Sequence, residues 1–177
     1  MIRRVVTGVD GSGKSVVVKD GRPPVAREYV QTPGFADAFI WHTDAIPSVA
    51  SETADKPLAS FIPGPGETVA LTVTLPPGSV YADPGYDPEA ARAEDLAMMP
   101  GLIDLFETDA PGMHATPTVD YVVVTEGEVV LELDDGVTVP LNVGDVVVQN
   151  APRHAWRNRT DKPATFFVVL TGLEDAK

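Results

Sequence analysis

The side chains best suited to chemistry gather in the second half of the chain, in the segments 113–127 and 144–158. In the second segment, a strand period of two puts His154, Trp156 and Asn158 on one face. Two of these three are polar where an ordinary core would be apolar, and burying an unpartnered polar group costs free energy. The pattern therefore predicts a functional interior pocket, where imidazole could move a proton or bind a metal. Trp156 fits a core filler as well as a wall for substrate stacking.

Residues 8–15 read GVDGSGKS and match the phosphate-binding pattern G-x-x-x-x-G-K-S at every fixed position. That loop holds phosphate only where a helix begins at the lysine, because the first amides of the helix and its dipole meet the phosphates. Here valines at 16–18 follow, and then Pro23-Pro24, which could not sustain a helix. We therefore interpret the segment as a glycine-rich hairpin turn and expect no nucleotide.

The composition limits the classes of partner. The 177 residues include 26 Asp and Glu against 13 Lys and Arg, a net charge of −13, which repels phosphate backbones and anionic lipid surfaces. We expect no nucleic acid or membrane partner, and no apolar run approaches the roughly 20 residues that span a bilayer. The chain has no cysteine, so it has no disulfide, thiolate zinc site or thiol nucleophile. Without a signal-peptide pattern at its start, we expect a cytoplasmic protein.

Short strands must position the candidate residues, because 17 prolines and 15 glycines divide the chain into short pieces. Valine-rich residues 2–8 and 15–19 flank a turn-prone stretch and predict a hairpin. A proline-rich connection is expected over 45–66 and a helical insert over 88–107, broken by the Pro-Gly pair at 100–101. Alternation predicts strands with one buried face. The other expected strands lie near 38–42, 67–75, 128–134, 137–141, 146–148, 154–157 and 165–170.

Two motifs in these segments resemble the signature motifs of the cupin superfamily. The first cupin motif reads roughly H-x-H, three or four residues, E, six residues, G. His114, Asp120 and Gly127 fall on its first histidine, its glutamate and its closing glycine. The second motif ends in H-x-x-x-N, and His154 and Asn158 fall on that pair.

The resemblance implies a divalent metal ion (Fe, Zn, Mn or Ni), although Thr116 stands where the family has its second histidine. His114, Asp120 and His154 would be both the metal ligands and the catalytic groups. Two imidazoles and one carboxylate form a facial set that leaves positions open on iron(II) or a similar ion. The residues alone also allow purely structural roles. A histidine near the start of a strand can be simply hydrogen-bonded at an edge or surface, and an aspartate before a strand can form a turn. The residues expected to contact cofactor, water or ligand are Thr116, Trp156 and Asn158.

We predict an all-β fold: a small antiparallel β-barrel of the cupin or jelly-roll type, with an N-terminal hairpin and a short helical insert. One cupin-like domain is expected over 1–177, with N-terminal strands and a connection in 1–66 and the barrel in 67–177. The insert over 88–107 either packs on the barrel or acts as a lid. His42 is interpreted as structural. The resemblance also implies a homodimer.

The predicted function is an enzyme acting on a small molecule with a carbonyl or carboxylate group, bound in the barrel interior with a divalent metal. Decarboxylase, isomerase, cyclase and dioxygenase chemistry all occur on this fold, and the fold does not choose among them. The alternative is a metal-free module that binds or senses a small molecule, which the missing second histidine favours.

ATP should not bind through residues 8–15, because no helix can begin at Lys14. Calorimetry of the full chain with ATP and magnesium measures this directly. Micromolar binding that Lys14→Ala abolishes would overturn the hairpin interpretation.

Overall fold

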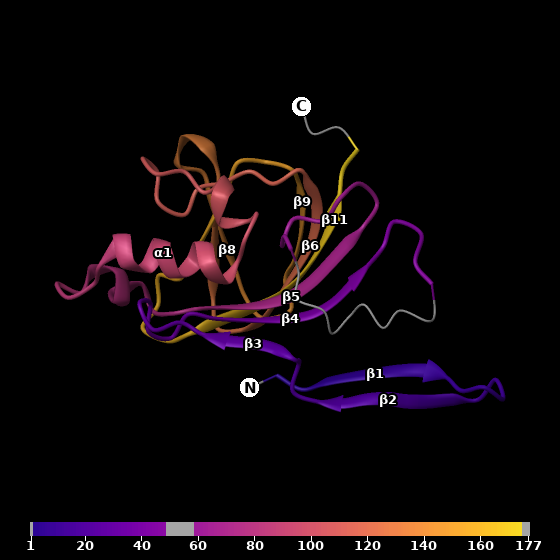
Figure 1. The fold of residues 1–177 in the computed structure, drawn as a ribbon. Helices are drawn as coiled ribbons and strands as arrows, with labels where there is room; N and C mark the ends of the chain where they lie inside the picture. Colours follow the sequence, from indigo (N-terminus) through magenta and orange to yellow (C-terminus); the bar gives the residue numbers. More distant parts are fainter. Residues whose placement is uncertain (1, 49–58, 175–177) are drawn as a thin grey trace.

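The computed structural model describes residues 2–48 and 59–174, so part of the predicted 45–66 connection lies outside the described residues. Antiparallel strands make up most of the described chain (Figure 1). The largest sheet has six strands, in the order β3-β4-β5-β11-β6-β9. These are β3 (Val25–Glu28), β4 (Ala36–Thr43), β5 (Thr68–Leu75), β11 (Ala164–Gly172), β6 (Thr118–Glu126) and β9 (Val146–Asn150).

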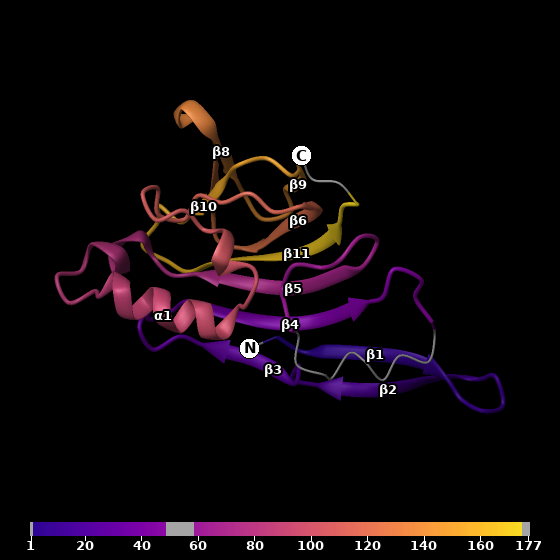
Figure 2. The ribbon, with the colours of Figure 1, turned by 45° about the horizontal axis from the view of Figure 1, so that its top comes forward.

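The sequence of β11 explains its place at the centre of this sheet. Its burial alternates residue by residue, with Phe166, Val168 and Leu170 on the buried face. β-Branched and aromatic side chains suit such a half-buried pleated surface. Figure 2 shows the sheet as a curved layer from β3 to β9. Since β3 and β4 pair into the same sheet as β5, the segments 1–66 and 67–177 share one sheet, and the single-domain assignment stays a prediction.

A second sheet has three strands, β10 (Ala155–Arg157), β7 (Val129–Glu132) and β8 (Thr138–Leu141), in that order. Val129 and Leu131 of β7 are buried. The buried face predicted for 137–141 holds only at Leu141, since Val139 is 40% exposed. The reason is that β8 is an edge strand of this sheet, with β7 as its one neighbour there.

The main apolar core is built from side chains of both sheets. Burying them drives the packing of sheet on sheet, at about 25 cal/mol per Å² of apolar surface. The all-β antiparallel fold predicted from the sequence is thus confirmed. Core residues include Phe39 of β4, Val69 and Leu71 of β5, Val122 and Val124 of β6, Val129 and Leu131 of β7, Leu141 of β8, and Phe166 and Val168 of β11.

The N-terminal hairpin is present and projects from the rest of the molecule (Figures 1 and 2). It consists of β1 (Arg4–Val9) and β2 (Ser15–Gly21), paired antiparallel. The Asp10 carboxylate closes the turn by accepting hydrogen bonds from the amides of Ser12, at 2.8 Å, and Lys14, at 3.0 Å. A strand begins at Ser15 where a phosphate-binding loop would need a helix, so the hairpin interpretation is confirmed.

The helical insert consists of α1 (Pro88–Met98) and the short 3-10 helix η3 (Ile103–Leu105). Asp87 caps α1 by accepting from the amides of Glu89 and Ala90, both at 3.0 Å, and proline takes the first helical position. The predicted break at 100–101 separates the two helices. Two further 3-10 turns are η2 (Gly78–Ala82) and η4 (Asp134–Gly136). No described helix is long and apolar enough to cross a membrane.

Hydrogen bonds hold α1 against the edge of the large sheet near β3. The Glu94 carboxylate accepts from the amides of Val30, at 2.9 Å, and Gln31, at 2.7 Å. Arg27 donates to the carbonyl of Met98 at the end of α1. These contacts favour packing as the role of the insert, and motion as a lid stays a prediction. The apolar residues of the insert that pack on the core are Leu96, Met98, Met99, Leu102, Ile103 and Phe106.

Ile103→Ala should lower the free energy of unfolding by roughly 2–5 kcal/mol, because a 4% exposed side chain leaves a cavity when truncated. Leu105→Ala is the matched control in the same short helix. Leu105 is 39% exposed, so its removal should cost less than about 1 kcal/mol. Denaturant titration of both variants measures this. Equal losses would contradict the packing described for the insert.

Candidate functional site

The two segments that carry the candidate chemistry meet at a short antiparallel bridge. The amide of His114 donates to the carbonyl of His154 at 2.9 Å, and the amide of His154 donates to the carbonyl of His114 at 2.8 Å. The centroids of the two imidazole rings are 4.3 Å apart. The structure therefore brings these two predicted residues side by side.

Two arginines tie the flanking loops together around this bridge. The guanidinium of Arg153 donates two hydrogen bonds of 2.6 Å to the carboxylate of Glu107. Arg157 donates to Glu132 at 2.7 Å and to the carbonyl of Pro111 at 2.7 Å. Bidentate guanidinium–carboxylate pairs fix geometry well, so they hold the loop before His114 against the segment of His154.

The backbone sets the tautomer of both histidines. Nδ1 of His114 lies 3.0 Å from the carbonyl oxygen of Gly112, and Nδ1 of His154 lies 3.0 Å from that of Pro152. A carbonyl oxygen can only accept, so the neutral rings carry their hydrogen on Nδ1. Each Nε2 therefore keeps a free lone pair, which can accept a proton or bind a metal.

Apolar surroundings keep these rings uncharged. Phe106 stacks on His114 with centroids 4.0 Å apart, and Trp156 meets His154 edge to face at 5.7 Å. Burial, with a smaller contribution from neighbouring His154, lowers the pKa of His114 to about 4. Burial likewise lowers the pKa of His154. Both imidazoles are therefore neutral at pH 7.

Asp120 supplies a buried carboxyl to the same interior. It lies on the inward face of β6, is 5% exposed, and its Oδ1 has no hydrogen-bond partner within the protein. Burial raises the pKa of Asp120 to about 6, against a smaller lowering by the Thr118 hydroxyl. A buried oxygen without a partner costs free energy unless a ligand or water pairs with it.

Thr116 and Asn158 are held by contacts within the protein. The Thr116 hydroxyl accepts from Thr118 at 2.7 Å. The Asn158 amide donates to the carbonyls of Leu75, at 3.3 Å, and Lys162, at 2.6 Å, while its oxygen accepts from the amide of Thr160 at 3.0 Å. The Asn158 side chain thus braces the loop after β10, and its contact with a ligand stays a prediction.

A cavity of about 910 Å³ contains the whole predicted site. Its walls are mostly apolar, and the helical insert forms part of them. The charged lining residues have both signs: Arg92, Arg157 and Arg159, with Asp95, Glu107, Asp120 and Glu132. The predicted site residues that line it are His114, Thr116, Asp120, His154, Trp156 and Asn158. Apolar lining residues include Phe61, Leu71, Met99, Ile103, Val122 and Phe166.

Binding of a metal by His114, Asp120 and His154 stays a prediction. His114, Asp120 and His154 are not among the groups of three ligand atoms that lie within 4.8 Å of one another in the described part of the chain. A catalytic ion takes three protein ligands, and the two imidazoles offer two.

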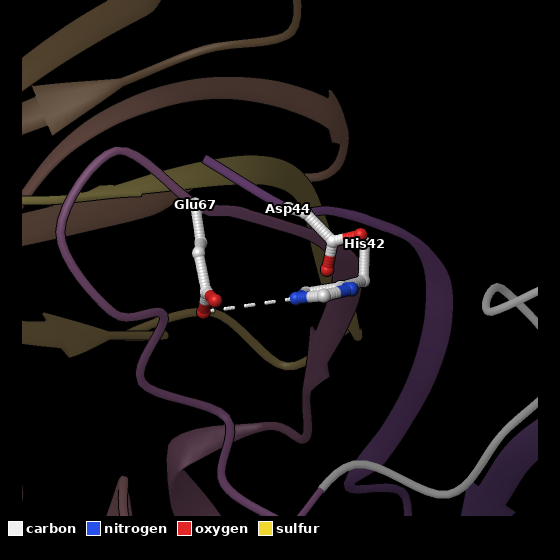
Figure 3. A group of neighbouring side chains, drawn as sticks. All are labelled: His42, Asp44 and Glu67. Carbon is white, nitrogen blue, oxygen red and sulfur yellow. Dashed lines mark ion pairs between the residues drawn. The ribbon is translucent and has the colours of Figure 1, made fainter. Parts of the chain in front are cut away.

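A different group meets that distance criterion, and the sequence did not indicate it. His42, Asp44 and Glu67 place one ligand atom each within 4.8 Å of the others (Figure 3). None of them lines the cavity. His42 appeared isolated in the sequence, because Glu67 reaches it only through the pairing of β4 with β5. The signal in the sequence that could have indicated it is the H-x-D spacing of His42 and Asp44 at the end of a strand.

Comparisons with known proteins agree with the motifs. Residues 106–170 match the family model of the cupin domain. The phomopsin biosynthesis cluster protein C' of Diaporthe leptostromiformis is 50% identical over 48 residues, 27% of this chain and 25% of that protein. The oryzines biosynthesis cluster protein J of Aspergillus oryzae is 41% identical over 80 residues, 41% of this chain and 45% of that protein. The chain thus spans less than half the length of these curated relatives.

Among solved structures, a cupin 2 conserved barrel domain protein from Salinispora arenicola is similar at a TM-score of 0.42 and 15% identity. The match covers 82% of this chain and 86% of that one.

The pH dependence of the unfolding free energy should reveal the ionisation of the buried Asp120 carboxyl. Because its pKa is raised to about 6 in the folded state, the unfolded chain loses this proton first as the pH rises above 4. The carboxyl therefore destabilises the folded state progressively between pH 4 and 6. Relative to Asp120→Asn, the unfolding free energy of the natural protein should fall by roughly 2–3 kcal/mol from pH 4 to 7, about two pKa units. Denaturant titrations across that range test this, and a constant difference would contradict it.

Proposed function

We propose that the interior cavity, which is lined partly by residues of the segment 106–170 that matches the family model of the cupin domain, is an enzyme active site. The proposed reaction moves a proton on a small organic molecule that has a carbonyl or carboxylate group. His114, His154 and Asp120 are the proposed catalytic residues.

The observation that carries this proposal is the pair of neutral imidazoles at the bridge. Each Nδ1 is engaged by a backbone carbonyl, so each Nε2 is available as a base. The protonated fraction of Asp120, about a tenth at pH 7 for a pKa of about 6, supplies an acid in the same cavity. Groups whose environments shift their pKa values in this way are typical of acid–base catalysis.

The cavity favours a substrate with a sizeable apolar body. Its volume of about 910 Å³ and aromatic and aliphatic walls suit such a molecule, and Arg92 and Arg159 can attract a carboxylate. Two relatives named above are biosynthesis cluster proteins, which supports a small-molecule substrate for this chain as well.

In the proposed step, Nε2 of one histidine takes a proton from the carbon next to the substrate carbonyl. The electron pair of that C–H bond forms a C=C bond, and negative charge develops on the carbonyl oxygen. The protonated form of Asp120, which is the minor form at pH 7, donates a hydrogen bond to that oxygen and stabilises its charge. The same charge raises the pKa of the nearby imidazole as the reaction proceeds, so a ring with a low resting pKa can still take the proton. Return of the proton to the opposite face of the same carbon, or to the far end of a conjugated C=C bond where the substrate has one, gives an isomer.

A divalent metal is the second candidate, favoured by the orientation of the histidines. Metal-bound histidines usually donate their other ring N–H to a carbonyl or carboxylate, as both rings do here. His114, His154 and Asp120 would hold Fe, Zn, Mn or Ni, and such an ion would supply Lewis-acid polarisation of a substrate oxygen. A metal-free binding module remains the third candidate, and homodimerisation and a cytoplasmic location stay predictions.

Proton transfer can be measured without the natural substrate, as deuterium uptake from D₂O. Phenylpyruvate is a suitable first probe because it joins an aromatic body to a carbonyl and a carboxylate, followed by other small keto acids. The protein should accelerate exchange at the carbon next to the carbonyl, measured by proton NMR. His114→Ala and His154→Ala should each lower the rate by about 10²-fold or more.

Tyr121→Phe is the matched control. Tyr121 follows Asp120 in β6, lies on the opposite face of the strand and is 54% exposed. Its rate should equal that of the natural protein. Melting temperatures of all variants identify any loss of fold. Exchange that is unaffected by either histidine substitution in folded protein would contradict the proposed function.

A further inference from the structure

We propose that His42, Asp44 and Glu67 form a binding site for a divalent transition-metal ion. This site is separate from the cavity, because none of its residues lines it. The inference is also independent of the proposed function, since it uses none of the residues of the cavity.

The site lies where two paired strands meet at one end of the large sheet. His42 is in β4, Asp44 follows the last residue of β4, and Glu67 precedes β5. In the β4–β5 register, His42 is opposite Val69 and Thr43 is opposite Thr68. Figure 3 shows the three side chains converging on one point from these two strands.

The distances suit a single ion. The three ligand atoms lie within 4.8 Å of one another, and His42 Nε2 is 3.8 Å from a Glu67 carboxylate oxygen. Two ligands bound about 2.1 Å from one ion at angles of 90–120° are roughly 3.0–3.6 Å apart. Side-chain rotations that move the ligand atoms by a few tenths of an ångström to about 1 Å would therefore bring them to the distances of a coordination set.

Backbone contacts hold Glu67 and the two strands in this arrangement before any ion binds. The Glu67 carboxylate accepts a hydrogen bond of 2.9 Å from the amide of Gly64, and the carbonyl of Glu67 accepts one of 3.0 Å from the amide of Gly172 in β11. The hydroxyls of Thr43 and Thr68 are 2.6 Å apart and join the two strands beside the cluster. Ligands that are fixed in this way lose little entropy on binding.

The negative charge of the two carboxylates in the cluster also favours the binding of a cation. Two carboxylates within 4.8 Å of each other repel, and the whole chain has a net charge of −13. An imidazole with two carboxylates suits Zn²⁺ and similar ions, whereas Ca²⁺ and Mg²⁺ prefer oxygen ligands alone. We therefore assign the site to an ion of the zinc type. The bound ion would link the end of β4 to the start of β5.

The test is calorimetric titration of chelator-treated protein with Zn²⁺ alone. The chain used is His114→Ala/His154→Ala, in which the cavity has lost its imidazoles, and the natural chain is titrated in parallel. We expect one Zn²⁺ per chain with micromolar affinity. Glu67→Gln and His42→Gln should each weaken it by about tenfold or more. Ca²⁺ should bind at least about tenfold more weakly than Zn²⁺.

Glu67→Gln is a mild change, because the glutamine oxygen can still accept the Gly64 amide. Asp145→Asn is the matched control, since Asp145 also accepts a backbone amide, that of Asn142 at 2.8 Å, in a loop. It should leave Zn²⁺ affinity unchanged. If the double variant does not fold, the loss of one Zn²⁺ equivalent from the natural chain on Glu67→Gln gives the same answer. Zn²⁺ affinity unchanged by both Glu67→Gln and His42→Gln, or no micromolar binding, would overturn the proposal and leave a simple His42–Glu67 ion pair.

Discussion

The reciprocal pair of backbone hydrogen bonds between His114 and His154 is the constraint on which the candidate site depends. Each bond fixes one of the two motif-bearing segments relative to the other. Once the backbones are paired, the rings can only lie side by side, with their centroids 4.3 Å apart. The ion pair between Arg153 and Glu107 reinforces the pairing. Without this bridge the two histidines would belong to separate loops.

Burial then gives the bridged residues their chemistry. The aromatic rings of Phe106 and Trp156 exclude water from the imidazoles, and the low dielectric disfavours their charged forms. The same exclusion of water favours the protonated form of Asp120. A core that stabilises the fold by burying apolar surface therefore also sets two neutral bases beside a carboxyl whose pKa is raised to about 6. Fold stability and proposed catalysis share the same apolar walls.

Features of the fold and the site could be predicted from the sequence where they depend on residues within one segment, and not where they depend on a partner from another segment. The hairpin follows from alternating valines around a glycine-rich turn, and period two placed His154, Trp156 and Asn158 on one face of the cavity. The role of the Asn158 amide could not be predicted, because its partners at Leu75 and Lys162 are contributed by other segments. The His42 cluster was missed for a related reason. Its carboxylate partner comes from the next strand of the sheet, and strand register cannot be read from either strand alone.

The central claim is that both buried histidines are neutral with their hydrogen on Nδ1, which leaves Nε2 free for chemistry. Long-range ¹H–¹⁵N NMR of labelled protein reads the tautomer and the pKa of each ring directly. The account predicts protonated Nδ1 and unprotonated Nε2 on both rings at pH 7, with His114 titrating near pH 4. Hydrogen on Nε2 of both rings, or a His114 pKa at or above the ordinary value of about 6.5, would contradict it.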